Sequence, residues 1–206
     1  MQREEKSERS RRAVLDAALH LFAHQGYRAT TMREIAERAG VSTGNVYHHF
    51  PDKERIFREL IDEYFAIADT NRFPFRRVLE SSTQRFPDNL EELGFAARDS
   101  IRQFRLHNLL IYVDVIEFGG THIQKFYGEM AERFTRMMEA QGSLEEIRAR
   151  LRPEVSPTSA LLLATRMFFN YFSVEILFGV NAPFGKDSRE VVVEIADMIR
   201  NGVCAR

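Results

Sequence analysis

The chain has 206 residues, of which 44% are hydrophobic, enough for one large domain or for a small domain plus a larger one. Its formal net charge of -1 excludes a uniformly basic nucleic-acid coat, although residues 1–60 carry 11 Lys and Arg against 9 Asp and Glu. Sparse Pro and Gly between long amphipathic runs favour an all-helical fold.

Three features of the sequence bear on cellular location. The single cysteine, Cys204, excludes an internal disulfide and fits a reducing cytoplasm. The charged N-terminus lacks the apolar segment of a signal peptide. The most apolar run, residues 160–180, contains Arg166, Asn170 and Glu175, which suit lipid poorly. We therefore expect a cytoplasmic protein.

The first predicted helix begins near residue 7 or 10 and ends at about Gln25, where Gly26 is placed to stop it. On this helix His20 and His24 have the four-residue spacing of metal ligands. Because no third ligand follows at a helpful spacing, we expect no metal site.

The stretch Thr31–Phe50 carries two short helical patterns that meet at a turn around Gly40. Thr31 is placed to cap the first pattern, and Glu34 completes a capping box. Ser42 is placed to cap the second, which is barely two turns long. This arrangement is typical of a helix-turn-helix, a DNA-binding motif.

The second of these helices has two different sides. On a 3.6-residue wheel Val46 and Phe50 point the same way, into a small core. The remaining positions, which are small, polar or able to form hydrogen bonds, are Thr43, Gly44, Asn45, Tyr47 and His48. Such groups are useful against base edges and phosphates. A fourth helix, capped by Asp52, continues to about Ala68.

Residues 8–68 resemble the N-terminal domain of the TetR family of bacterial transcriptional repressors. The matching segments are L-F-A-H-Q-G-Y, then T-T-M-R-E-I-A-E-R-A-G-V-S-T-G-N-V-Y-H-H-F, then P-D-K-E-R-I-F. The resemblance implies a DNA-binding domain over 8–68 and a helical ligand-binding and dimerisation domain over 69–206. Asn45 stands where family members vary, so no base preference is carried over.

The same resemblance implies roles for single residues. Phosphate contacts are implied for Thr31, Tyr47 and Lys53, and base-edge contacts for Thr43, Gly44, Asn45 and His48, with Ser42 in the same surface. Free N–H groups at the start of a helix favour a phosphate near Thr31. A mid-helix glycine costs about 1 kcal/mol, which indicates close approach at Gly44. An ordinary cap, a solvated charge and a loose helix start are the plainer interpretations of Thr31, Lys53 and Gly44.

Beyond residue 68 the sequence predicts further helices and no repeat; the expected total is about nine, four of them before residue 69, although the individual ranges bring it to eleven. Their expected ranges are 74–86, 87–106, 108–118, 121–141, 143–152, 156–178 and 188–202. The helix over 156–178 is apolar on nearly every side, and a partner subunit would cover it. We therefore expect the last two helices to pair in a two-fold homodimer, whose two reading helices bind a palindromic DNA site.

The C-terminal region also contains candidates for an effector pocket. An aromatic cavity for a small, largely apolar molecule is predicted from Tyr112, Phe118, Phe126, Tyr127, Phe168, Phe169, Asn170 and Phe172. A plain aromatic core is the alternative.

The preferred hypothesis is a homodimeric repressor that a ligand releases from a palindromic operator, without cofactor or metal. The alternative is a DNA-binding regulator or architectural protein with no small-molecule ligand. An enzyme is not expected, because no catalytic motif is present.

Overall fold

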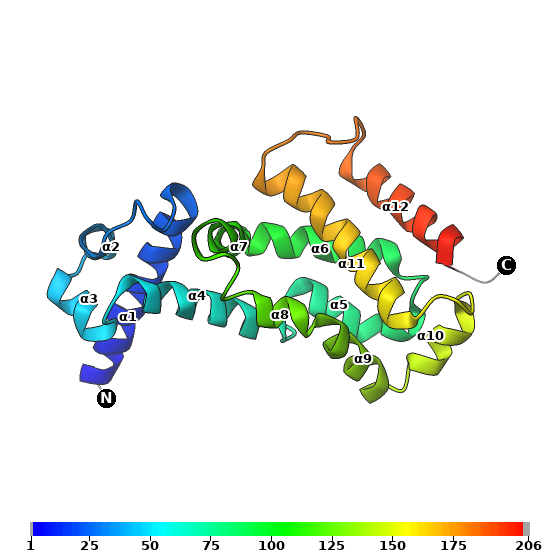
Figure 1. Cartoon of the computed structure of the whole chain (residues 1–206), viewed down its shortest axis with the longest axis horizontal. Helices are drawn as coiled ribbons and strands as arrows, with labels where there is room; N and C mark the ends of the chain where they lie inside the picture. The colour runs from blue at the N-terminus through cyan, green and yellow to red at the C-terminus, as the bar shows by residue number, and fades with distance from the viewer. Residues whose placement is uncertain (1, 204–206) are drawn as a thin grey trace. The chain divides into compact units, whose positions relative to one another are not determined.

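The computed structural model describes residues 2–203, so Cys204 lies outside the described residues. These residues form twelve α-helices, one 3-10 turn (Thr83–Arg85) and one π turn (Ser173–Leu177), and contain no strand (Figure 1). The all-helical fold is thereby confirmed. The helices are α1 (Gln2–Gln25), α2 (Met32–Ala39), α3 (Thr43–His49), α4 (Lys53–Ala68), α5 (Pro74–Ser82), α6 (Leu90–Gln103), α7 (Arg105–Phe118), α8 (Gln124–Gly128), α9 (Met130–Ala140), α10 (Leu144–Arg150), α11 (Pro157–Phe172) and α12 (Ser188–Val203).

The twelve helices exceed the expected total of about nine, because the expected ranges themselves number eleven and one of them is divided in two. The run expected over 121–141 breaks at Glu129 into α8 and α9, next to Gly128, a poor helix former. In contrast, α1 begins at Gln2, ahead of the expected start. Its first turns carry Glu, Lys and Arg, which favour a helix even without an apolar stripe.

The helices divide into two compact units. One contains the chain up to Ala66 together with Leu106–Gln124, and the other contains Ile67–Arg105 together with the chain from Lys125 onward. Helix α7 thus packs with the N-terminal helices although 39 residues of the chain (67–105) separate them. The sequence pattern does not indicate this association.

The core of the first unit is built by the apolar faces of α1 to α4. Each helix contributes side chains with almost no exposed surface: Val14, Leu15, Ala18 and Phe22 from α1, Ile35 and Ala36 from α2, Val46 from α3, Phe50 after it, and Ile56, Phe57, Leu60 and Ile61 from α4. Burial of so many large side chains fixes the positions of two short helices that would not be stable alone.

The core of the second unit is centred on α11. This helix packs against α6, α9 and α12. At the crossing with α6, Gly94 lies so close to Phe168 and Val192 that a Cβ atom there would be 2.8 Å from both side chains. Among the described residues one continuous helical stretch, Pro157–Leu177, is long and apolar enough to cross a membrane by length and composition. Its packing against three helices is that of a core helix.

Candidate nucleic-acid interface

Helix α2 begins with the predicted capping box. The Thr31 hydroxyl accepts a hydrogen bond from the Glu34 backbone N–H (3.2 Å), and the Thr31 N–H donates to the Glu34 carboxylate (2.7 Å). The Thr31 hydroxyl also donates to that carboxylate (2.8 Å), and these bonds lower the pKa of Glu34. The cap fixes the start of α2 with its polar atoms at the surface.

The turn between α2 and α3 depends on Gly40. This residue has φ +67°, a left-handed conformation that favours glycine, and its N–H bonds back to Ala36 and Glu37. The Val41 N–H donates to the Ala36 carbonyl (3.0 Å) and ends the helix. The chain then reverses into α3 within three residues.

Helix α3 presents the face that the sequence predicts. Ser42 caps it, accepting a hydrogen bond from the Asn45 N–H (3.2 Å), while Val46 is fully buried. Tyr47 is 53% exposed although it is a large aromatic residue. The other exposed residues of this face are Thr43, Gly44 and His48. An exposed tyrosine beside small and polar groups suits contact with a sugar-phosphate backbone and base edges.

The side chain of Asn45, unlike those of its neighbours on α3, forms a hydrogen bond with another helix. Its amide oxygen accepts a hydrogen bond from the Ser10 hydroxyl of α1, 2.5 Å away, and the residue is only partly exposed. Nothing in the sequence pattern indicates this contact across 35 residues.

Lys53 is held at the first turn of α4. Its ammonium group donates to the backbone carbonyls of Tyr27 and Thr30, 2.6 Å from each. Burial is the main reason that its pKa is lowered. One of its three N–H donors therefore remains for a phosphate.

A groove of about 840 Å³ runs beside α3, between the first turns of α1 and the turn at Val41. Lys6 and Arg9 line it, together with Asn45 and His48. Sequence reasoning did not single out these two cations. The signal in the sequence is the set of basic residues at the start of the helix that precedes the motif, to which Lys6 and Arg9 belong.

The next two cations on α1 form ion pairs with carboxylates. Arg11 forms an ion pair with Glu59 of α4, and Arg12 pairs with Asp16 and with Glu63 of α4 (2.8 Å). These two arginines fasten α1 to α4, whereas no carboxylate within the described residues pairs with Lys6 or Arg9.

The predicted effector residues are distributed over both units. Phe118 lies in the first unit, where its ring contacts Tyr27 (4.6 Å between centroids) and Phe57 (4.9 Å). Tyr112 belongs to the same unit and is partly exposed. The sequence does not distinguish these two from the other six.

The other six predicted effector residues belong to the second unit. Phe168 and Phe172 are fully buried in α11, while Phe169 packs on Phe75 (5.2 Å) and Phe73 (6.3 Å). Phe126 lies under Arg133 and Tyr127 under Arg166, and Asn170 is exposed. None of the eight residues lines the groove beside α3 or the groove on α12.

The rings of the two histidines with metal-ligand spacing stack on each other. The centroids of His20 and His24 are 4.1 Å apart, and the His24 ring nitrogen approaches the His20 carbonyl at 2.8 Å. No group of three or more possible metal-binding side chains occurs in the part of the chain that the structure describes.

Comparison with known proteins agrees with the geometry. Residues 14–60 match the family model described as bacterial regulatory proteins, tetR family. Over 60 residues the chain is 48% identical to the HTH-type transcriptional repressor KstR2 of Rhodococcus jostii (strain RHA1), covering 27% of this chain and 29% of that protein. It is 28% identical over 145 residues to the A-factor receptor protein of Streptomyces griseus, covering 70% and 49%. The chain thus spans less than half of the length of these curated relatives.

A solved structure extends the likeness in fold. NalD, the secondary repressor of the MexAB-OprM multidrug efflux pump in Pseudomonas aeruginosa, superposes with a TM-score of 0.61 at 23% identity, covering 96% of this chain and 98% of that chain. The matched family consists of regulatory proteins rather than enzymes, in agreement with the expectation from the motifs.

Proposed function

We propose that this chain, whose residues 14–60 match the model of the tetR family of bacterial regulatory proteins, is a cytoplasmic, DNA-binding transcriptional repressor of that family. The observation that carries the proposal is the exposed face of α3. The opposite, apolar side of α3 is buried, and the caps at Thr31 and Ser42 fix the starts of α2 and α3. The Rhodococcus relative is named a transcriptional repressor, which supports repression rather than activation.

The proposed DNA surface consists of the eight predicted residues. Thr31, Tyr47 and Lys53 contact phosphates, and Thr43, Gly44, Asn45 and His48 contact base edges, with Ser42 holding the start of α3. The start of α2 supports a phosphate site, because Thr31 is exposed there and the first N–H groups of a helix have no partner within the helix. Residues 8–68 form the proposed DNA-binding domain, and residues 69–206 the ligand-binding and dimerisation domain.

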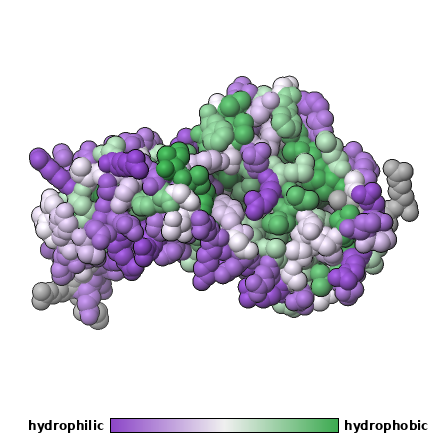
Figure 2. Space-filling view, viewed as in Figure 1, coloured by the Kyte–Doolittle hydropathy of each residue, from purple (hydrophilic) through white to green (hydrophobic). Residues whose placement is uncertain are grey.

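We propose that the protein binds a palindromic operator as a homodimer formed through α11 and α12. The outer faces of these helices expose apolar side chains, with Leu163 at 62%, Val193 at 50% and Met198 at 64%. Hydrophobic side chains accordingly reach the surface over α11 and α12 in Figure 2. Exposed apolar groups on two adjacent helices are typical of an interface between subunits.

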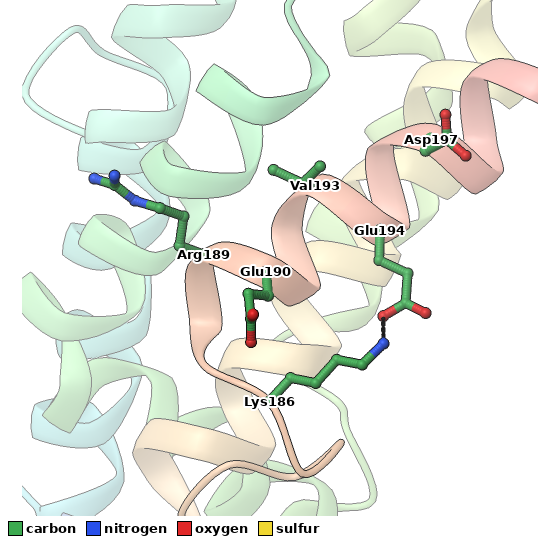
Figure 3. A pocket seen from close by; sticks show the side chains of 6 residues that line it. All are labelled: Lys186, Arg189, Glu190, Val193, Glu194 and Asp197. Atoms are coloured by element: carbon green, nitrogen blue, oxygen red, sulfur yellow. Dashed lines mark hydrogen bonds and ion pairs between the residues drawn. The ribbon is translucent and has the colours of Figure 1, made fainter.

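The charged residues of α12 suit such an interface. Figure 3 shows Val193 between Arg189 on one side and Glu194 and Asp197 on the other. Glu194 is already paired with Lys186 (2.8 Å). In a two-fold antiparallel pairing of α12 helices, Arg189 of each subunit would approach the acidic end of the partner helix, so the charges would be complementary.

We further propose that a small, largely apolar effector releases the repressor from DNA. The A-factor receptor protein is named as a receptor, which supports a ligand-binding role for residues 69–206. The predicted residues are Tyr112, Phe118, Phe126, Tyr127, Phe168, Phe169, Asn170 and Phe172. No cofactor is required.

A DNA-binding regulator without a small-molecule ligand is the second candidate. The observation that favours it is the mutual packing of Phe73, Phe75, Phe104 and Phe169, whose rings fill space in the second unit. Screening apolar compounds for release of bound DNA separates the two candidates.

DNA binding is tested by selecting sequences from a randomised double-stranded pool with the purified full chain. A repressor of this kind enriches a palindromic site, and its affinity falls steeply with salt. The Tyr47→Ala variant loses affinity for that site, while Arg152→Ala, which removes an exposed charge from the second unit, keeps it. Absence of any enriched site, or equal affinity of Tyr47→Ala, would contradict the proposal.

A further inference from the structure

The contact between Ser10 and Asn45 joins the supporting helix α1 to the reading helix α3. The Ser10 hydroxyl donates to the Asn45 amide oxygen, and the Asn45 backbone N–H is bound by the Ser42 cap at 3.2 Å. Both the backbone and the side-chain amide of Asn45 are therefore held. A held amide presents a fixed pattern of donors and acceptors.

The direction of this hydrogen bond determines what the amide can offer. Because the oxygen of Asn45 turns toward α1, its NH2 group keeps two donors with no partner among the described residues. A freely turning asparagine reads adenine with its oxygen and its nitrogen together. An asparagine whose oxygen is occupied fits base atoms that only accept, such as N7 and O6 of guanine.

The surroundings of the pair suit a DNA strand. Asn45 and Ser10 both line the groove beside α3. Arg9, directly before Ser10, and Lys6, one turn before Ser10 on α1, line it as well, together with one acidic residue, Glu5. Neither of these cations has a carboxylate partner within the described residues, whereas Arg11 and Arg12 are paired with α4. Unpaired cations along a groove attract phosphates and bring bases within reach of Asn45.

We propose that Ser10 is a specificity-determining positioning residue: its hydroxyl holds the Asn45 amide with the donors outward, so that Asn45 selects a base with acceptor atoms. The proposal rests on the proposed DNA-binding function. It gives α1, which is not proposed to contact a base, an effect through Asn45 on the sequence that α3 recognises. The chemical class that Asn45 recognises is an acceptor-only major-groove edge, with guanine the best match.

The test compares base preferences of the full-length wild type with those of Ser10→Ala, Ser10→Thr and Asn45→Ala. Duplexes carrying each of the four base pairs at every position of the wild-type selected site are titrated by fluorescence anisotropy. For Ser10→Ala we expect the guanine preference at one position to fall about fivefold and adenine to gain, because about 1 kcal/mol of hydrogen bonding no longer fixes the amide. Ser10→Thr, which keeps the hydroxyl, should retain the wild-type preference.

A double mutant separates positioning from simple stabilisation. If Ser10 acts through Asn45, adding Ser10→Ala to Asn45→Ala changes no base preference further, so the two effects are not additive. The melting temperature of each variant, measured in parallel, shows whether it is folded. A uniform loss of affinity for all sequences in folded Ser10→Ala, additive effects, or a wild-type preference for an A·T pair at the position whose base preference Asn45→Ala removes would overturn the proposal. Failure of the wild type to select any DNA would instead contradict the proposed function.

Discussion

The ammonium group of Lys53 lies 4.2 Å from the centre of the Tyr27 ring and 2.6 Å from the Tyr27 carbonyl oxygen. Tyr27 in turn contacts Phe57 of α4 and Phe118 of α7. A lysine that the family resemblance assigns to a phosphate is therefore also bound to the loop before α2. The loop ends at Thr31, so Lys53 connects the start of α4 with the cap of the DNA-binding motif.

We predict that Lys53→Met lowers the free energy of unfolding by about 2 kcal/mol, because two charge-assisted hydrogen bonds and a cation–π contact are lost. Urea denaturation measures this change. The same variant should reduce the slope of log affinity against log salt by about 0.9, the effect of losing one phosphate contact. A stable Lys53→Met protein with an unchanged salt slope would refute both roles.

The reading helix has room for a methyl group at Gly44 in the unbound protein. A Cβ atom there would meet only the Ser42 hydroxyl oxygen, at 4.0 Å. We therefore predict that Gly44→Ala stabilises the protein by up to about 1 kcal/mol, because alanine favours a helix more than glycine. If DNA approaches the backbone closely at this point, the same variant binds the selected site at least tenfold more weakly. Unchanged binding would identify Gly44 as an ordinary loose helix start.

Acid sensitivity is predicted from His107, which stacks on Tyr64 at 5.4 Å. Burial, helped by the charge of Arg12, lowers the pKa of His107 from 6.5 to about 4, although Glu63 and Asp16 act in the opposite direction. Between these values the unfolded chain binds a proton that the folded chain does not. Stability is therefore present above pH 6.5 and falls as the pH falls toward 4, by about 1.4 kcal/mol per pH unit.

The measurement is the free energy of unfolding at pH 7.5 and at pH 5.5 for wild type and His107→Gln. Since glutamine does not titrate, the wild type should lose about 1 kcal/mol more stability than the variant over this interval. Equal losses would show that His107 is not the group responsible.

Close packing of α6 against α11 and α12 leads to a prediction for Gly94. Its added methyl group would lie 2.8 Å from Phe168 and from Val192. Because Phe168 is fully buried and cannot turn away, Gly94→Ala should cost about 1–3 kcal/mol. Gly128→Ala is the matched control, since no atom lies within 4 Å of a Cβ there. The measurement is the melting temperature of the two variants. A Gly94→Ala protein as stable as the Gly128→Ala control would contradict the prediction.

The proposed dimer is tested at Val193, the apolar residue at the centre of the charged groove on α12. Val193→Glu places another carboxylate near Glu190, Glu194 and Asp197 and should convert the dimer into monomers. The control is Val115→Glu on α7, where the valine is similarly exposed at 54%. Sedimentation equilibrium measures the association. If Val193→Glu remains a dimer, or if the wild type is a monomer, the proposed interface is wrong.

The sequence by itself determined the local structure of the DNA-binding motif. Thr31 with Glu34, Gly40 and Ser42 specify caps and a turn through interactions that span four residues or fewer, so their pattern is visible along the chain. The buried positions Val46 and Phe50 follow from helical periodicity in the same way. The exposed face of α3 consists of the positions that this periodicity leaves outside the core.

Only the tertiary structure decided which side chains are free to act. Asn45 and Lys53 look equally available in the sequence, yet one is bound to Ser10 and the other to the loop at Tyr27. Phe118 and Phe169 look alike as aromatic residues of a helical region, but they lie in different compact units. Hydrogen bonds and packing between residues far apart in the chain produce these differences, and no periodicity or spacing records them.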